Sequence, residues 1–197
     1  GVKRIADTIT QALLSPPKPK ENAKILDVGA GSGFFTLRIF KKLRRHLPNA
    51  SFYAMDLTPA MLNVLARKTS EITPFLGVAE NIKGSMEHAR KYLNIPEKFD
   101  AIFSTLMLHH CPNIEPVFES LRKAVDANGK VIILDLCKHS FQEFMEEMGD
   151  LHLGFEPEQI KEKAEKHFSK TEIKKIPGVC CKCSSRSAEL FVAYMTP

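Results

Sequence analysis

The sequence predicts an α/β fold built on an open, mostly parallel sheet. The stretch from Ile25 to Phe35 has the pattern of an apolar strand, a glycine turn and the start of a helix. Ile25, Leu26 and Val28 form the apolar run that is typical of a strand covered by helices on both faces. Further apolar runs alternate with segments of helical periodicity as far as residue 136, which is the pattern of a parallel sheet with crossover helices.

Each element follows from local patterning. We predict helices at 2–14, 34–46, 85–93, 114–125, 141–148 and 157–168, and one that begins at Pro59 after the N-cap Thr58. We predict strands at 24–28, 51–55, 74–78, 99–104, 130–136, 171–176 and 188–195, with a turn at 126–129 and a loop at 177–186. The expectation is one domain over residues 1–197, with an N-terminal helix and linker (1–23), a core (24–136) and a C-terminal part of helices and a hairpin (137–197).

The composition fits a soluble globular chain with a sizeable core. The 197 residues are 44% hydrophobic and 26% charged, with a mild net charge of +5. The basic cluster Lys41–Arg45 closes a predicted helix, where cations face the negative end of its dipole, so nucleic acid is disfavoured as a partner.

No hydrophobic run reaches membrane length, and no secretory signal is visible. Five cysteines, an odd number, favour a reducing cytoplasm over a secreted disulfide framework. We therefore expect a cytoplasmic protein with no membrane contact. The chain begins at Gly1 and not at a methionine, so it is compatible with a fragment or a trimmed chain.

The spacing of the glycines limits the ligand. A dinucleotide fingerprint, G-x-G-x-x-G, would place its third glycine at Phe34, whereas this chain has Gly29, Gly31 and Gly33. Asp27 stands directly before the turn, where its carboxylate would repel a pyrophosphate and would suit an ammonium and a sulfonium group. A nicotinamide oxidoreductase is therefore disfavoured.

With Asp27, Gly29, Gly31 and Gly33, the chain resembles the class I S-adenosylmethionine-dependent methyltransferases, whose first motif is Asp-x-Gly-x-Gly-x-Gly. The tail of the fourth strand, Thr105 to His110, resembles the small-molecule branch of that family, in the group of UbiE and arsenite methyltransferases. The resemblance implies S-adenosyl-L-methionine as the cofactor. It also implies a Rossmann-like three-layer sandwich whose seven strands run in the order 3-2-1-4-5-7-6, with the last strand antiparallel.

The same resemblance assigns further cofactor contacts. Asp56 ends the second strand, where a carboxylate accepts hydrogen bonds from both ribose hydroxyls, and Leu57 beside it could cover an adenine face. The adenine turn matches residues 77–80, with Val78 at the usual aspartate position, and residues 84–87 are a second candidate. The full set of expected cofactor-binding residues is Asp27, Gly29, Ala30, Gly31, Gly33, Asp56, Leu57, Ala79, Glu80 and Ser104.

Two adjacent histidines follow the fourth strand, at the sheet edge where parallel sheets bind ligands. Because histidine titrates near neutrality, His109 and His110 are candidates for a general base, and we predict His109 as the catalytic residue. The alternative is that a histidine here only packs and makes structural hydrogen bonds. No residue is assigned as a metal ligand from the sequence.

The cysteines leave a second possibility open. If the topology holds, Cys111, Cys137, Cys180, Cys181 and Cys183 all lie at the carboxyl edge of the sheet. Thiolates there could hold zinc or a thiophilic substrate such as trivalent arsenic, although the five do not align with the cysteine motif of arsenite methyltransferases. The plainer alternative is that they are small buried hydrophobic residues.

The sequence thus predicts a methyltransferase that transfers a methyl group to a small molecule by in-line displacement, with proximity and orientation as the main source of acceleration. Two alternatives stay open: methylation of a thiol-bound metalloid, and binding of S-adenosyl-L-methionine without turnover. The acceptor and the oligomeric state are not determined by the sequence.

Overall fold

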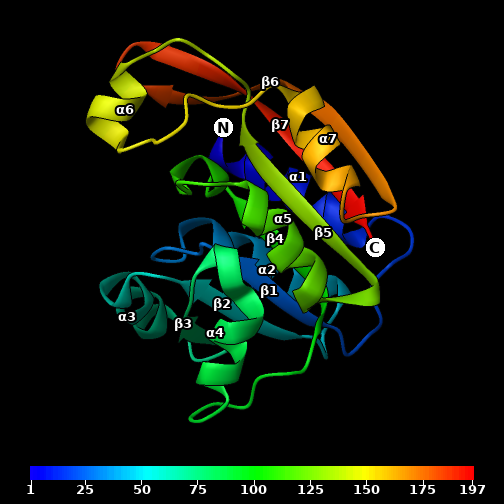
Figure 1. Ribbon diagram of the computed structural model, residues 1–197. Coiled ribbons are helices and arrows are strands. Elements are labelled where there is room, and N and C mark those ends of the chain that lie inside the picture. Colours follow the sequence, from blue (N-terminus) through cyan, green and yellow to red (C-terminus); the bar gives the residue numbers. More distant parts are fainter.

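In the computed structural model the backbone of residues 1–197 is described, together with all side chains except those of residues 178–181. One seven-stranded sheet runs through the molecule in the order β3-β2-β1-β4-β5-β7-β6 (Figure 1). Its strands are β1 (Lys24–Val28), β2 (Ser51–Asp56), β3 (Ile72–Leu76), β4 (Phe99–Thr105), β5 (Val125–Leu136), β6 (Lys170–Cys183) and β7 (Arg186–Thr196). The pairs among β1 to β5 are parallel, and β7 is antiparallel to both of its neighbours. The predicted fold class and strand order are confirmed.

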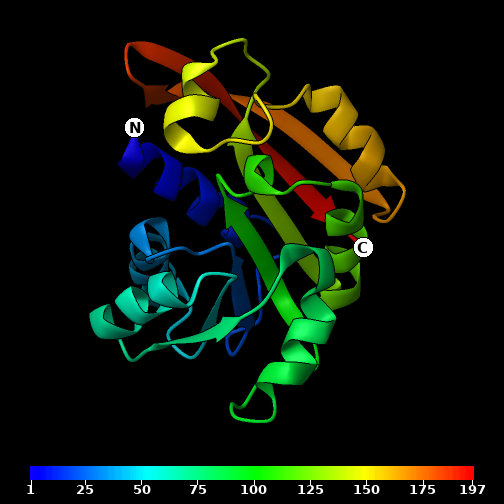
Figure 2. The ribbon, with the colours of Figure 1, turned by 60° about the vertical axis from the view of Figure 1, so that its left-hand side comes forward.

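Helices cover both faces of the sheet, which gives three layers (Figures 1 and 2). The helices are α1 (Val2–Leu14), α2 (Phe34–His46), α3 (Pro59–Lys68), α4 (Ile82–Ala89), α5 (Glu115–Ala124), α6 (Glu143–Met148) and α7 (Pro157–Glu165). Buried side chains of α4, α5 and α7 form one apolar cluster with the sheet, and those of α1, α2 and α3 form a second cluster with its other face. Two apolar layers on one sheet explain why its central strands carry hydrophobic side chains on both faces.

The predicted bounds are exact where local signals are strong. The structure has α1, β1 and α2 at the predicted residues. Other elements are shifted: β3 lies two residues earlier than expected, and α4 begins at Ile82 instead of Ser85. The predicted turn at 126–129 was wrong, because these residues belong to β5, at a shift in the β4–β5 register. The predicted loop at 177–186 was also too long, since β6 and β7 extend to a short turn at 184–185.

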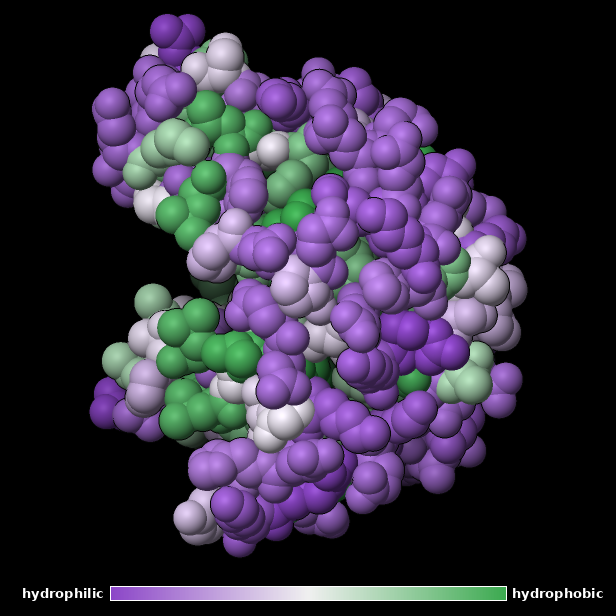
Figure 3. Space-filling model, viewed as in Figure 1, coloured by the Kyte–Doolittle hydropathy of each residue, from purple (hydrophilic) through white to green (hydrophobic). Residues whose placement is uncertain are grey.

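The carboxyl ends of the parallel strands meet at one edge of the sheet, and the surface there is hollowed. The space-filling view shows a notch between the part that contains α6 and the part that contains α3, with apolar side chains on both sides (Figure 3). Most of the exposed large apolar residues belong to these two parts: Leu57, Met61, Val64, Leu76 and Val78 on and around α3, and Met145, Met148 and Leu151 on and after α6. The notch therefore offers a partly apolar surface to a ligand.

No helix in the described chain combines the length and the hydrophobicity that crossing a membrane requires.

Candidate functional site

The turn between β1 and α2 is held tightly against the rest of the sheet. The N–H groups of Gly29 and Ala30 both donate to the carbonyl oxygen of Met55 on β2, at 2.8 and 3.1 Å. Gly29 has a φ of +78°, and a Cβ atom there would lie 2.1 Å from Cγ of Met107. Both packing against Met107 and the backbone conformation therefore favour glycine at position 29.

Gly31, two residues further on, faces open space. Its φ is +58°, and a Cβ atom built there would meet no atom within 4 Å. Its N–H donates to Oδ2 of Asp56 at 2.9 Å. Glycine at position 31 is thus not explained by packing within the chain, and it leaves room for a ligand to approach the backbone.

Asp56 joins the ends of β1 and β2. While Oδ2 accepts the Gly31 N–H, Oδ1 accepts the N–H of Thr58 at 3.0 Å. The side chain is only partly buried, and each carboxylate oxygen has a second acceptor position. Leu57 next to it is 71% exposed, a high value for a leucine. An acidic acceptor and an uncovered apolar side chain are therefore adjacent, as the expected ribose and adenine contacts require.

Asp27 lies inside the protein beneath the turn. Its side chain is buried, and Oδ2 accepts a hydrogen bond from Oγ1 of Thr36 on α2 at 2.7 Å. Burial, together with a smaller contribution from the charge of Asp56, raises the pKa of Asp27 to about 7 against the opposing effect of the Thr36 hydrogen bond. Its expected role beside the ammonium group of a ligand stays a prediction.

This raised pKa predicts how stability depends on pH. Folded Asp27 binds a proton more tightly than unfolded Asp27, so its stabilising effect is complete below pH about 4 and is lost as the pH rises through about 7. The full effect is at most about 4 kcal/mol. We expect urea unfolding of the ligand-free chain at pH 5 and pH 8 to show a larger loss of stability for the wild type than for Asp27→Asn. Equal losses of stability in the two proteins would contradict a raised pKa for Asp27.

Of the two candidate adenine turns, the first has the right place in the fold. Residues 77–80 follow the carboxyl end of β3, whereas residues 84–87 lie within α4 and form no turn. Val78 is 42% exposed and Glu80 is also exposed, while Ala79 is buried. Ser104 is buried in β4, and its hydroxyl has no hydrogen-bond partner among the described residues. The cofactor contacts of these residues stay predictions.

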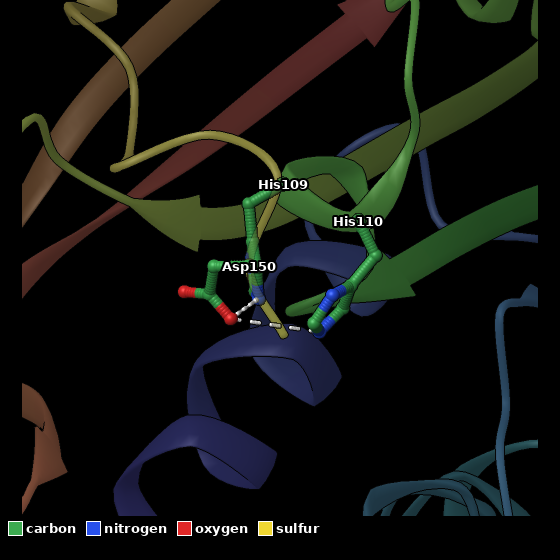
Figure 4. A group of neighbouring side chains, drawn as sticks. All are labelled: His109, His110 and Asp150. Carbon is green, nitrogen blue, oxygen red and sulfur yellow. Dashed lines mark ion pairs between the residues drawn. The ribbon is translucent and has the colours of Figure 1, made fainter. Parts of the chain in front are cut away.

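The two histidines lie on a short 3-10 helix, η2 (Leu108–His110), after β4. His109 is buried, and its Nδ1 lies 2.6 Å from Oδ1 of Asp135. Its Nε2 lies 3.4 Å from Oδ1 of Asp150 (Figure 4). Burial lowers the pKa of His109, but the two carboxylates outweigh this effect and raise it above its usual value. Because both ring nitrogens already face carboxylates, this geometry does not favour His109 as a free general base, and its catalytic role stays a prediction.

His110 is more accessible. Its side chain is 46% exposed, with Nε2 3.9 Å from Oδ1 of Asp150 and Nδ1 3.4 Å from the carbonyl oxygen of Gly149. Burial and the neighbouring His109 lower the pKa of His110.

Asp135 and Asp150 were not predicted from the sequence as site residues. Asp135 is a fully buried carboxylate within the apolar strand β5, and that isolated charge was the available signal. Asp150 comes from the loop after α6, and nothing near it in the sequence indicates that it would meet residues from β4 and β5.

A family model described as "Methyltransferase domain" matches residues 19–181. The chain belongs to this family. The match includes the glycine turn, Asp56 and the two histidines, and it agrees with the resemblance to the class I enzymes of the small-molecule type. The site described above therefore lies within the methyltransferase domain.

Two curated relatives are methyltransferases, and a solved structure shares the fold. The chain is 28% identical over 132 residues to malonyl-[acyl-carrier protein] O-methyltransferase 1 of Ilyobacter polytropus, covering 67% of this chain and 45% of the relative. It is 27% identical over 120 residues to the ubiquinone/menaquinone biosynthesis C-methyltransferase UbiE of Rickettsia peacockii, covering 61% and 47%. The chain thus spans about half the length of these relatives. The YcgJ protein of Bacillus subtilis shares the fold, with a TM-score of 0.70 at 11% identity over 98% of this chain and 97% of that one.

The cofactor of this methyltransferase domain is S-adenosyl-L-methionine. The residues present fit it, because open space lies above Gly31, Asp56 offers free acceptor positions, and Leu57 is uncovered.

The cysteines with described side chains do not form a cluster in this methyltransferase domain. Cys111, Cys137 and Cys183 are buried free thiols: Cys111 follows η2, Cys137 follows β5, and Cys183 ends β6. Burial raises the pKa of Cys111 to about 12, and the nearby Glu80 carboxylate adds to this effect. Among the residues with described side chains, no cysteine belongs to a group that could hold a metal ion. Cys180 and Cys181, also named in the sequence analysis, lie outside the described side chains.

Proposed function

We propose that this domain transfers the methyl group of S-adenosyl-L-methionine to a small-molecule acceptor by in-line displacement. One observation carries the proposal: Asp56 at the end of β2 accepts the N–H of Gly31, whose Cβ position is open. This contact brings together the two motifs that the family uses for its cofactor, at the edge of the sheet where such folds bind ligands.

The cofactor supplies a methyl group on a sulfonium, which is already an excellent leaving group. The chain therefore has to bind, orient and exclude water, and these tasks account for most of the acceleration. We infer that Asp56 holds the ribose, that Leu57 and the turn at 77–80 contact the adenine, and that the backbone at Gly31 lies against the amino-acid part.

The acceptor is expected to have an apolar part. The notch between α3 and α6 has apolar side chains on both sides (Figure 3), and Met61 on α3 and Met148 at the end of α6 are among the exposed apolar residues of these two parts. The names of the two curated relatives refer to a malonyl group on an acyl-carrier protein and to ubiquinone and menaquinone biosynthesis. A small acyl or aromatic acceptor is consistent with these names and with the notch. The odd number of cysteines supports a reducing, cytoplasmic setting.

The thiol-based alternative has less support. Buried thiols with raised pKa values, such as that of Cys111, are poor ligands for a metalloid at neutral pH. The described cysteines also lie apart, in different local environments. We therefore do not favour arsenite as the acceptor.

Two measurements, made one after the other, test the proposal. Calorimetric titration is expected to show micromolar binding of S-adenosylhomocysteine and no binding of NAD. Formation of S-adenosylhomocysteine from S-adenosyl-L-methionine is then followed with a panel of carboxylic acids, phenols, quinols, amines and thiols, and with arsenite.

Turnover with an organic acceptor is the expected result. Turnover with arsenite alone, abolished when the cysteines are alkylated, would favour the metalloid alternative. Tight cofactor binding with no turnover on any acceptor would favour a non-catalytic binding protein, and binding of NAD in place of S-adenosylhomocysteine would overturn the proposal.

A further inference from the structure

We propose that His109, His110 and Asp150 form a binding site for a divalent transition-metal ion, with Zn²⁺ as the ion that fits best. The histidines lie on η2 after β4, and Asp150 lies on the loop that follows α6, so two distant segments meet here (Figure 4). One ligand atom from each residue lies within 4.8 Å of the other two. Two imidazoles and a carboxylate are a common donor set for zinc.

The orientation of the rings is that of metal ligands. His109 directs Nδ1 at Oδ1 of Asp135, 2.6 Å away, and His110 directs Nδ1 at the carbonyl oxygen of Gly149, 3.4 Å away. Both partners can only accept, so Nδ1 of each ring carries the proton, and Nε2 of a neutral ring carries a lone pair. The two Nε2 atoms lie 3.4 and 3.9 Å from Oδ1 of Asp150. When both rings are neutral, three acceptor atoms face one another, and a cation between them would satisfy all three.

Asp150 supplies a second, independent indication. It is 4% exposed, and its Oδ2 atom has no hydrogen-bond partner among the described residues. Among the residues with described side chains, Asp150 forms ion pairs with His109 and His110, and neither of these partners is a lysine or an arginine. A buried carboxylate without a fixed cation is costly, and a metal ion would remove that cost.

Asp135 completes the arrangement behind His109. A histidine that binds a metal through Nε2 almost always donates its Nδ1–H to a carboxylate or carbonyl group, which fixes the ring and makes it more basic. Asp135 is fully buried in β5 and provides that carboxylate. We therefore assign Asp135 as a positioning residue for His109.

A zinc ion bound here would keep one coordination position for a further ligand. Three protein ligands leave the fourth position of a tetrahedral zinc ion open, and the partly exposed His110 makes the site reachable from solvent. It also lies close to the cofactor turn, because Met107, just before η2, lies where a Cβ of Gly29 would be. The proposal goes beyond the methyl transfer proposed above, and metal binding can be tested without the cofactor.

The test uses the whole chain after treatment with EDTA. Zn²⁺ is added in calorimetric titration and in thermal melting, and Co²⁺ is added for visible absorption. The main variant is His110→Gln, because this side chain is 46% exposed and its replacement is expected to leave the fold intact. Asp150→Asn and Asp135→Asn are the further variants, and His88→Gln, an exposed histidine on α4, is the matched control.

The wild type is expected to bind one equivalent of Zn²⁺, with a rise in the melting temperature, and to give the intense visible bands of four-coordinate Co²⁺. His110→Gln and Asp150→Asn should weaken Zn²⁺ binding by at least tenfold, and Asp135→Asn by about 10- to 100-fold. His88→Gln should bind Zn²⁺ as the wild type does.

Three results would overturn the site: no stoichiometric binding of Zn²⁺ or Co²⁺, unchanged affinity in His110→Gln, or a near-ultraviolet sulfur-to-cobalt band that indicates cysteine ligands. Binding of S-adenosylhomocysteine is measured on the same samples. A chain that binds S-adenosylhomocysteine and no metal would reject the metal site alone, and the reverse result would reject the proposed cofactor role alone.

Discussion

Replacing Asp56 with alanine is expected to reduce the affinity for S-adenosylhomocysteine by at least about 100-fold. The carboxylate holds the N–H groups of Gly31 and Thr58 at 2.9 and 3.0 Å, and it is the proposed acceptor for the ribose hydroxyls. Each hydrogen bond to a charged group contributes about 1.5–3 kcal/mol, so loss of the ribose contacts alone accounts for such a change. Calorimetric titration measures the affinity, and circular dichroism confirms the fold.

Asp100 provides a matched control. It is also an aspartate on a strand, and its Oδ2 accepts the N–H of Lys24 at 2.7 Å, but it lies near the opposite end of β4 from the histidines. We expect Asp100→Ala to bind S-adenosylhomocysteine within about threefold of the wild type, even if its stability falls. A folded Asp56→Ala variant with wild-type affinity would remove the main support for the ribose assignment.

The second large effect is expected from Gly31→Ala, which should bind S-adenosylhomocysteine at least about 30-fold more weakly while remaining folded. A methyl group at position 31 meets no protein atom within 4 Å, and a φ of +58° costs an L-residue only about 1–2 kcal/mol. The methyl group would instead occupy space that the proposed cofactor position requires. Calorimetric titration measures the loss of binding, and thermal melting of the same sample measures any loss of stability.

Gly29→Ala should behave in the opposite way. Its methyl group would lie 2.1 Å from Cγ of Met107, so we expect a large fall in melting temperature before any question of binding arises. If Gly31→Ala bound S-adenosylhomocysteine normally, the open space above Gly31 would not be part of the cofactor site.

The sequence predicted most accurately the bounds of those helices and strands that depend on residues nearby in the chain. The bounds of α1, β1 and α2 follow from apolar periodicity and from proline and glycine signals within a few residues, and these bounds were predicted exactly. The extent of β6 and β7 was underestimated because it depends on pairing between two segments. Residues 126–129 have the composition of a turn, yet they belong to β5.

The same distinction holds at the candidate site. The glycine motif and Asp56 carry a recognisable pattern, and the structure brings them into contact. The cluster around His109 could not be predicted, because Asp135 and Asp150 reach it from a strand and a loop that are distant in sequence. The prediction of His109 as a base assumed a side chain that faces the crevice, whereas folding buries it between two carboxylates.

The packing of Met107 over Gly29 has a consequence for how this sequence can change over evolutionary time. The methionine side chain occupies the space that any side chain at position 29 would need, although the two positions are far apart in the sequence. A larger residue at position 29 is therefore tolerable only in a chain that also carries a smaller residue at position 107. Among related sequences, these two positions should vary together, whereas position 31 should vary independently of position 107.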